Sequence, residues 1–100
     1  MIRLTTPLLE FELPFSTGEI SILNIAFKQR GRVVLEKGLS DVELQKTVLL
    51  LKLTQEDTEK LIGDEYMNIQ LRCVLFGDEA IASDPIETYV DDVLKDGVLK

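Results

Sequence analysis

The sequence predicts an all-β protein, an antiparallel β-sandwich of about seven or eight strands in one domain over residues 1–100. Turn residues divide the chain into short apolar segments, as is typical of sandwiches and barrels. Within most segments apolar and polar residues alternate, which indicates strands with one buried face. A chain of 100 residues has enough apolar surface for one core, so a second domain is excluded.

The first strand is expected over residues 8–13, where Leu9 and Phe11 face one side and glutamates face the other. Pro7 and Pro14 bracket this segment. Because proline cannot donate a hydrogen bond to a neighbouring strand, we expect this strand at a sheet edge.

The next strands are expected over residues 20–29, 32–37, 42–45 and 48–53. Arg30-Gly31 suits a two-residue hairpin turn in which Gly31 adopts a positive φ. The segment 48–53 is apolar on both faces at its centre, which predicts a strand in the middle of a sheet.

A short helical turn is expected near residues 55–61. Thr54 has the side chain of an N-cap residue, and the acidic Glu56 and Asp57 follow in the first turn, where the helix dipole favours negative charge. Gly63 then ends the helical segment.

Residues 66–76 form the longest predicted strand. Gly77-Asp78 is expected to make a tight turn with Gly77 at positive φ, and strands follow over residues 80–83 and 86–90. Residues 91–95 fit either a strand extension or a helical turn. The predicted core consists of Leu9, Phe11, Leu23, Ile25, Phe27, Val33, Leu35, Leu49, Leu51, Ile69, Leu71 and Cys73.

Composition excludes most familiar catalytic chemistries. The chain has no His and one Cys, so Cys-His and Ser-His pairs, the common zinc sites and an intrachain disulfide are excluded. The net charge of −7 argues against nucleic-acid and anionic-membrane partners. No apolar run is long enough to span a bilayer, and no signal peptide is recognisable. We therefore expect a non-enzymatic protein that is cytoplasmic on synthesis and carries no cofactor or metal.

Structural roles explain the remaining candidate residues better than catalysis or ligand binding does. The acidic pairs, such as Asp64-Glu65, do not match the spacing of a calcium loop and are expected in solvated turns. Cys73 lies on an apolar strand face, so a buried and unreactive thiol is expected. The basic residues Lys28, Arg30 and Arg32 gather at one hairpin tip, where a solubilising role is favoured over an acidic partner.

Six stretches of the chain resemble a known group of proteins. They are residues 1–7, 33–37, 53–58, 69–72, 80–83 and 94–98, with the sequences Leu53-Thr54-Gln55-Glu56-Asp57-Thr58 and Leu94-Lys95-Asp96-Gly97-Val98 among them. The chain resembles short phage and prophage proteins of Gram-positive bacteria, and the small β-sandwich module at the N-terminus of phage baseplate proteins. Asp84-Pro85 and the order Gly77-Asp78 depart from the pattern of that group.

The resemblance implies a structural or assembly role in a phage tail or baseplate, and it implies no enzymatic activity. Such a protein would contact copies of itself or tail and baseplate proteins, and it could be part of the virion. We expect Ile22, Val34 and Val74 to form the contacts of a homo-oligomer. Their side chains lie on the strand faces opposite those of the main apolar alternation. In a monomer these three would instead pack under loops.

The alternative is an immunoglobulin-like module that binds a surface glycan or peptide, since the expected sandwich suits either role. Its binding patch would consist of Tyr66, Phe76 and Tyr89, the aromatic residues that the core does not need. A concave surface around these three would favour the alternative. An exposed, self-complementary strand edge would favour the assembly role.

Overall fold

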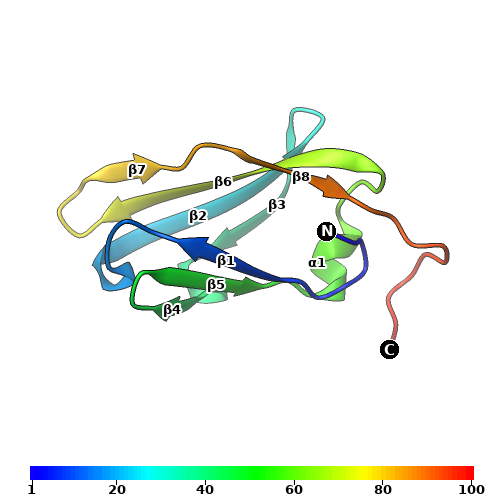
Figure 1. Ribbon diagram of the computed structural model, residues 1–100, viewed down its shortest axis with the longest axis horizontal. Coiled ribbons are helices and arrows are strands. Elements are labelled where there is room, and N and C mark those ends of the chain that lie inside the picture. Colours follow the sequence, from blue (N-terminus) through cyan, green and yellow to red (C-terminus); the bar gives the residue numbers. More distant parts are fainter.

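The computed structural model describes residues 1–100 and shows eight strands in two antiparallel sheets, as the sequence predicts (Figure 1). The smaller sheet has the order β1-β5-β4 and consists of β1 (Leu8–Glu12), β4 (Glu43–Gln45) and β5 (Val48–Lys52). The larger sheet has the order β3-β2-β6-β7, with β8 paired to the other half of β6. Its strands are β2 (Ile20–Gln29), β3 (Arg32–Gly38), β6 (Glu65–Leu75), β7 (Ala80–Ala82) and β8 (Ile86–Val90). Three short helices, η1 (Thr17–Glu19), η2 (Leu39–Asp41) and α1 (Gln55–Glu59), lie in the connections.

The smaller sheet confirms two expectations about strand position. β1 lies at an edge, as its flanking prolines predict, and β5 lies between β1 and β4. Leu49 and Leu51 of β5 point into the sandwich and are fully buried. Leu9 and Phe11 of β1 pack against the core but stay partly exposed, because an edge strand is covered on one side only.

The hairpin of β2 and β3 contains an irregularity that alternation alone does not reveal. Arg30 and Gly31 have φ angles of 52° and 73°, so both turn residues adopt the left-handed conformation of a type I′ hairpin. A register shift follows between Phe27 and Lys28, which pairs Val33 with Lys28. Val33 is 51% exposed, so its predicted core position is wrong. A bulge adds one residue to a strand and thereby reverses the faces beyond it.

The helical turn α1 begins at Thr54, as predicted. The Thr54 hydroxyl accepts a hydrogen bond from the Asp57 N–H at 3.0 Å, and the Asp57 carboxylate accepts one from the Thr54 N–H at 3.0 Å. Lys37 on β3 forms an ion pair with Asp57 at 3.0 Å. The reciprocal cap therefore also ties α1 to the larger sheet.

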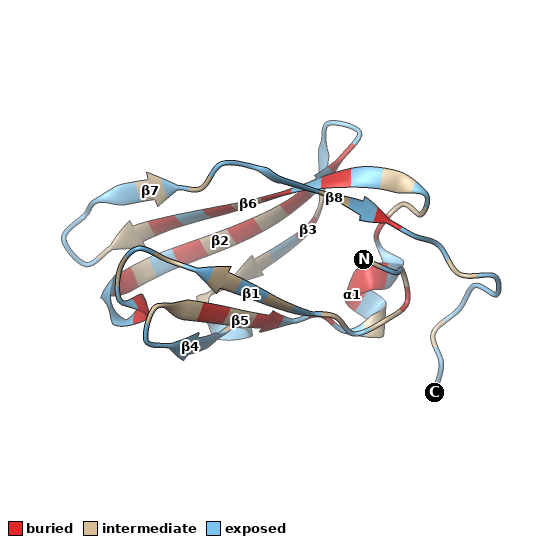
Figure 2. Cartoon of the chain, viewed as in Figure 1, coloured by how far each residue is buried: buried red, intermediate tan, exposed pale blue.

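The core lies between the two sheets, and most of the predicted core residues are buried there (Figure 2). Its largest fully buried side chains include Phe27, Ile25 and Met67. The sequence-based core did not include Met67, Leu53, Leu61, Ile20 and Val90, which the structure adds. Leu53 and Leu61 flank α1, so this short helix closes one end of the sandwich.

The turn after β6 differs from the sequence prediction, and the conformation of residues 91–95, which the sequence left undecided, is seen in the structure. Asp78, with φ 66°, takes the left-handed position of the turn after β6, and Gly77 does not. Residues 92–100 form neither a helix nor a strand. Asp91 makes a parallel bridge with Ile2, which brings the start of the chain to the edge of β8.

Candidate interaction surface

The outer face of the larger sheet carries most of the residues that the sequence singled out. On β2 and β6, Ile22 and Val74 are direct cross-strand partners, and Phe76 follows on the same side two residues later. Ile22 is 61% exposed and Phe76 is 73% exposed. Ala80 of β7 pairs with Val74 and adds a further apolar side chain. We call Ile22, Val74, Phe76 and Ala80 the apolar end of the face.

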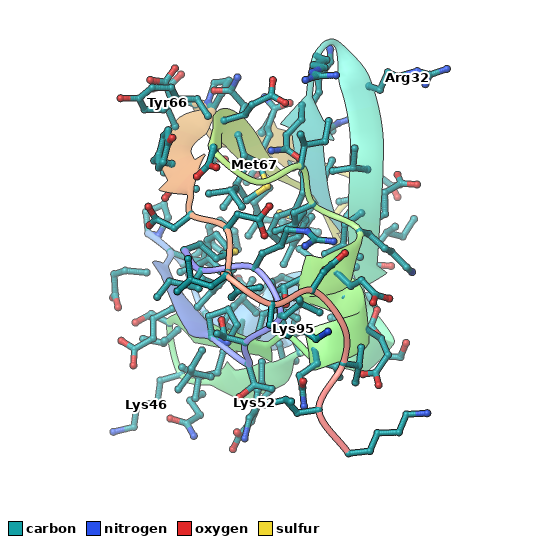
Figure 3. All side chains as sticks on the ribbon, turned by 90° about the vertical axis from the view of Figure 1, so that its right-hand side faces the viewer. Arg32, Lys46, Lys52, Tyr66, Met67 and Lys95 are labelled. Carbon is teal, nitrogen blue, oxygen red and sulfur yellow. The ribbon has the colours of Figure 1, made fainter.

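A pair of tyrosines marks the other end of the same face. Tyr66 of β6 and Tyr89 of β8 are cross-strand partners whose rings meet edge to face, with centroids 5.1 Å apart. Figure 3 shows Tyr66 pointing away from the sandwich, whereas Met67 beside it lies between the sheets. Desolvation raises the pKa of the Tyr89 hydroxyl, and the nearby carboxylates of Asp64 and Asp91 raise it further. This end of the face is therefore aromatic and acidic.

The structure does not bring Phe76 together with the tyrosines. Ten residues separate Phe76 from Tyr66 along one extended strand, a span of about 33 Å at roughly 3.3 Å per residue. A single binding patch made of Tyr66, Phe76 and Tyr89 is thus not formed.

Val34 behaves differently from the other proposed contact residues. It is partly buried and packs against the core, whereas Val33 beside it points outward. The cause is the same bulge, which makes Val34 the extra residue of β3 between Val33 and Leu35. Val34 is therefore misplaced as a surface contact, and Val33 is the exposed valine of this strand.

A polar hollow of about 480 Å³ lies in the middle of the outer face, between the two ends. Asn24 at its edge donates a hydrogen bond to Glu36 at 3.2 Å, and Gln70 donates one to the Ser83 carbonyl at 3.0 Å. Lys28 and Arg72 also line the hollow. Sequence reasoning missed this feature because its residues come from three strands whose register was unknown.

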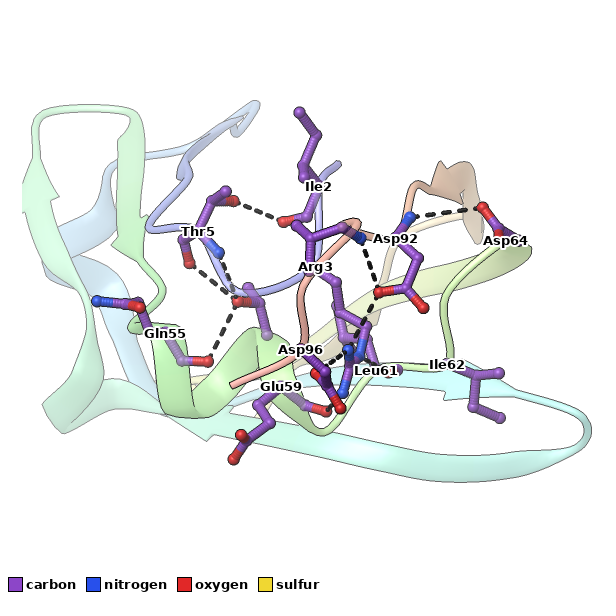
Figure 4. A network of polar contacts seen from close by, with 12 residues as sticks. Ile2, Arg3, Thr5, Gln55, Glu59, Leu61, Ile62, Asp64, Asp92 and Asp96 are labelled. Carbon is purple, nitrogen blue, oxygen red and sulfur yellow. Dashed lines mark hydrogen bonds and ion pairs between the residues drawn. The ribbon is translucent and has the colours of Figure 1, made fainter. Parts of the chain in front are cut away.

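Arg3 connects the two ends of the chain to α1 (Figure 4). Its guanidinium donates to the backbone carbonyls of Leu61 and Glu59 at 2.8 and 3.0 Å. It also forms ion pairs with Asp92 at 3.1 Å and Asp96 at 2.8 Å. The hydrogen bond to Asp96 raises the pKa of Arg3, against the effect of desolvation, and the same contact lowers the pKa of Asp96. No sequence pattern indicated this network.

The reactive side chains do not converge on a common point. Cys73 is buried, as expected, and desolvation raises the pKa of its thiol. Acidic residues do not gather into a group of three or more that could hold a metal ion. Arg30 at the basic hairpin tip forms an ion pair with Glu65 at 2.8 Å.

None of the helices has the length and apolar character required to cross a membrane. Comparison with known proteins gave no match among family models, curated proteins or solved structures. The outer face of the larger sheet, with its apolar end, its polar hollow and its tyrosine pair, is the candidate interaction surface of the molecule.

Proposed function

We propose that this chain is a non-enzymatic structural or assembly module of a phage or prophage, associated with the tail or baseplate, that works through protein–protein contacts. The observation that carries the proposal is the apolar end of the outer face. Ile22 and Phe76 expose most of their side chains there, and Val74 and Ala80 join them across three adjacent strands. Neighbouring apolar side chains on a sheet face are typical of surfaces that another protein covers.

The strand order also supports an immunoglobulin-like architecture. In that fold the B, E and D strands form part of one sheet, and the C′, C, F and G strands lie in the other. The orders β1-β5-β4 and β3-β2-β6, with β7 and β8 beside β6, correspond to these strands. Such a sandwich presents a broad, rigid sheet face, which suits contacts with other proteins better than it suits a catalytic site.

A glycan- or peptide-binding role is the second candidate, and the tyrosine pair is the observation that favours it. Tyr66 and Tyr89 expose aromatic surface beside Asp64 and Asp91. Without Phe76 the aromatic platform consists of these two rings alone. Binding of a glycan or peptide that Tyr66→Ala abolishes, with Phe76→Ala as the matched control, would favour this role over assembly.

The test of the assembly role is the protein content of purified phage particles from the bacterium that encodes the chain. Mass spectrometry should find the chain in finished particles or in tail and baseplate intermediates, in a fixed ratio to a tail protein. Deleting its gene should reduce the yield of complete tails. If the chain is absent from particles and intermediates and its deletion leaves tails unchanged, the proposal is wrong.

A further inference from the structure

The edge strands β1 and β8 lie on the same side of the sandwich (Figure 2). Ile86 on β8 is the cross-strand partner of buried Ile69 and therefore faces the interior, yet it is 50% exposed. On the opposite sheet, Leu9 and Phe11 also face inward and are only partly buried. Between them is an apolar groove of about 350 Å³ lined by residues of both edges. No strand of this chain covers the groove.

Backbone groups along the groove lack partners. β1 pairs only with β5, and the hydrogen bonds from Leu13 to Thr47 and from Leu53 to Pro7 place the odd-numbered residues of β1 against β5. The N–H and C=O groups of the even-numbered residues therefore point to the free edge. These residues are Leu8, Glu10 and Glu12.

The edge of β8 is covered over only part of its length. The Met1 ammonium donates to the Tyr89 carbonyl at 2.9 Å, and the Arg3 N–H donates to the Asp91 carbonyl at 2.8 Å. The same edge continues at Glu87, where these contacts have ended and the groove begins.

The outer edges of β4 and β3 carry polar side chains. The outer edge of β4 presents Glu43 and Gln45, and β3 carries Arg32 and Glu36. Charged and polar residues on edge strands prevent pairing with other chains. β1 also carries charged residues, Glu10 and Glu12, but only on its outer face. Its inner face adds the apolar lining of the groove to the free backbone groups, which is the arrangement that an added strand requires.

We propose that this groove accepts a strand from a second copy of the chain, its C-terminal residues 97–100, which adds to the free edge of β1. In immunoglobulin sandwiches a strand A lies beside strand B, and β1 corresponds to strand B. The donated segment would take the place of strand A. This inference rests on the proposed assembly function and names one contact between copies.

The C-terminal segment has the properties of a donor strand. Residues 92–100 form no backbone–backbone hydrogen bonds. Leu99 is 82% exposed and is held by two hydrogen bonds to the Gln55 side chain, of 3.0 and 2.8 Å. In an extended strand Leu99 would enter the groove while Lys100 faces outward. Lys100 would then lie beside Glu10 or Glu12, and opposite charges across strands are stabilising.

Within one copy, residues 97–100 lie outside the groove. Residues 1–3 occupy the edge of β8 between the groove and Asp91, where the C-terminal segment leaves the sheet. From there the segment runs away from the groove and ends near α1 (Figure 1). Leu99 is held beside α1 by the Gln55 side chain, so the groove of one copy is free to accept the segment of another.

Two complementary variants test this exchange. Leu99→Ser removes the donor and keeps the groove, whereas Ile86→Lys closes the groove and keeps the donor. Both also carry Ile22→Lys, so that contacts through the apolar end of the outer face do not contribute. Sedimentation equilibrium should give 11.3 kDa for each variant alone and twice that mass for their equimolar mixture. Leu94→Ser and Val33→Lys, at exposed positions outside the contact, should leave the association of the Ile22→Lys protein unchanged.

A mixture that stays at 11.3 kDa would overturn the inference. So would a Leu99→Ser protein that associates by itself as strongly as the Leu94→Ser control. If circular dichroism shows that Ile86→Lys is unfolded, Leu8→Lys on the facing edge takes its place. The detection of the chain in phage particles is independent of these variants, so the proposed function and the exchange can fail separately.

Discussion

Thr54 and Asp57 each accept a hydrogen bond from the backbone N–H of the other at the start of α1. The sequence predicted this cap because the side chains that form it are three residues apart. It did not predict the ion pair of Asp57 with Lys37, which lies twenty residues earlier on another element. Local chemistry is readable from sequence spacing, whereas contacts between distant elements depend on the register of the sheets.

Thr54→Ala should reduce the free energy of unfolding by about 0.5 to 2 kcal/mol, because it removes the acceptor for the Asp57 N–H. Urea denaturation measures the change. Thr54→Ser, which keeps the hydroxyl, should restore most of the loss, and Thr6→Ala at an exposed position should have little effect. An unchanged denaturation midpoint for Thr54→Ala would contradict the role of Thr54 as a cap.

Asp57 should contribute to the pH dependence of stability. Desolvation acts to raise the pKa of its carboxyl, but the Thr54 N–H and the Lys37 ammonium outweigh this and lower it. A lowered pKa in the folded state means that the contribution is complete above the ordinary carboxyl pKa of about 4 and is lost as pH falls through the folded value.

The free energy of unfolding of the Asp57→Asn protein should therefore fall less between neutral and acidic pH than that of the unsubstituted chain. Urea denaturation at both pH values measures the difference. Glu56→Gln is the matched control, because Glu56 is the exposed neighbour. It should keep the acid dependence of the unsubstituted chain. Equal acid dependence in Asp57→Asn and Glu56→Gln would show that Asp57 does not act in this way.

At the level of elements, most strands follow from alternation and turn residues, and the exceptions have identifiable causes. Val33 was assigned to the core because alternation places it with Leu35, but the bulge opposite Lys28 turns it outward. The turn after β6 uses Asp78 in the left-handed conformation, which aspartate tolerates better than most residues. The bulge and the left-handed Asp78 change neither the composition of the chain nor the period of its apolar residues, so a single sequence does not reveal them.

Gly63 lies directly against Asp92, which is far from it in the sequence. A Cβ atom at this position would clash with the side chain of Asp92, so a larger residue would displace Asp92 and weaken its ion pair with Arg3. Gly63→Ala should lower the free energy of unfolding by roughly 0.5 to 3 kcal/mol. Hydrogen exchange of the Asp91 and Leu99 amides, which donate to the Met1 carbonyl and the Gln55 side chain, should also become faster.

Gly77→Ala is the control for this substitution, since a Cβ atom there meets no other atom within 4 Å. It should leave both stability and hydrogen exchange close to those of the unsubstituted chain. If Gly63→Ala and Gly77→Ala behave alike, the close approach of Gly63 to Asp92 does not hold the C-terminal segment in place.

For the whole molecule, the sequence predicted the sandwich and the outward direction of Ile22 and Val74. It did not show that these two residues are direct cross-strand neighbours, nor that the tyrosines lie at the opposite end of the face. Both facts require the register of β6 with its partners. The polar hollow and the groove beside β1 arise in the same way, from residues that only the assembled sheets bring together.

Self-association is one of the two kinds of contact that the proposed function includes, the other being contact with tail or baseplate proteins. Substituting the apolar end with Ile22→Lys and Phe76→Lys should weaken it, because charges would replace the side chains that copies bury against one another. Tyr66→Lys is an equally exposed change at the other end of the face and should have a smaller effect. Equal effects of all three substitutions would argue against a specific contact at the apolar end.

The most direct test of the central claim is the mass of the unsubstituted chain, measured by light scattering at micromolar concentration and moderate salt. We expect a mass of at least twice 11.3 kDa that falls on dilution. A mass of 11.3 kDa at every concentration would contradict assembly through contacts between copies.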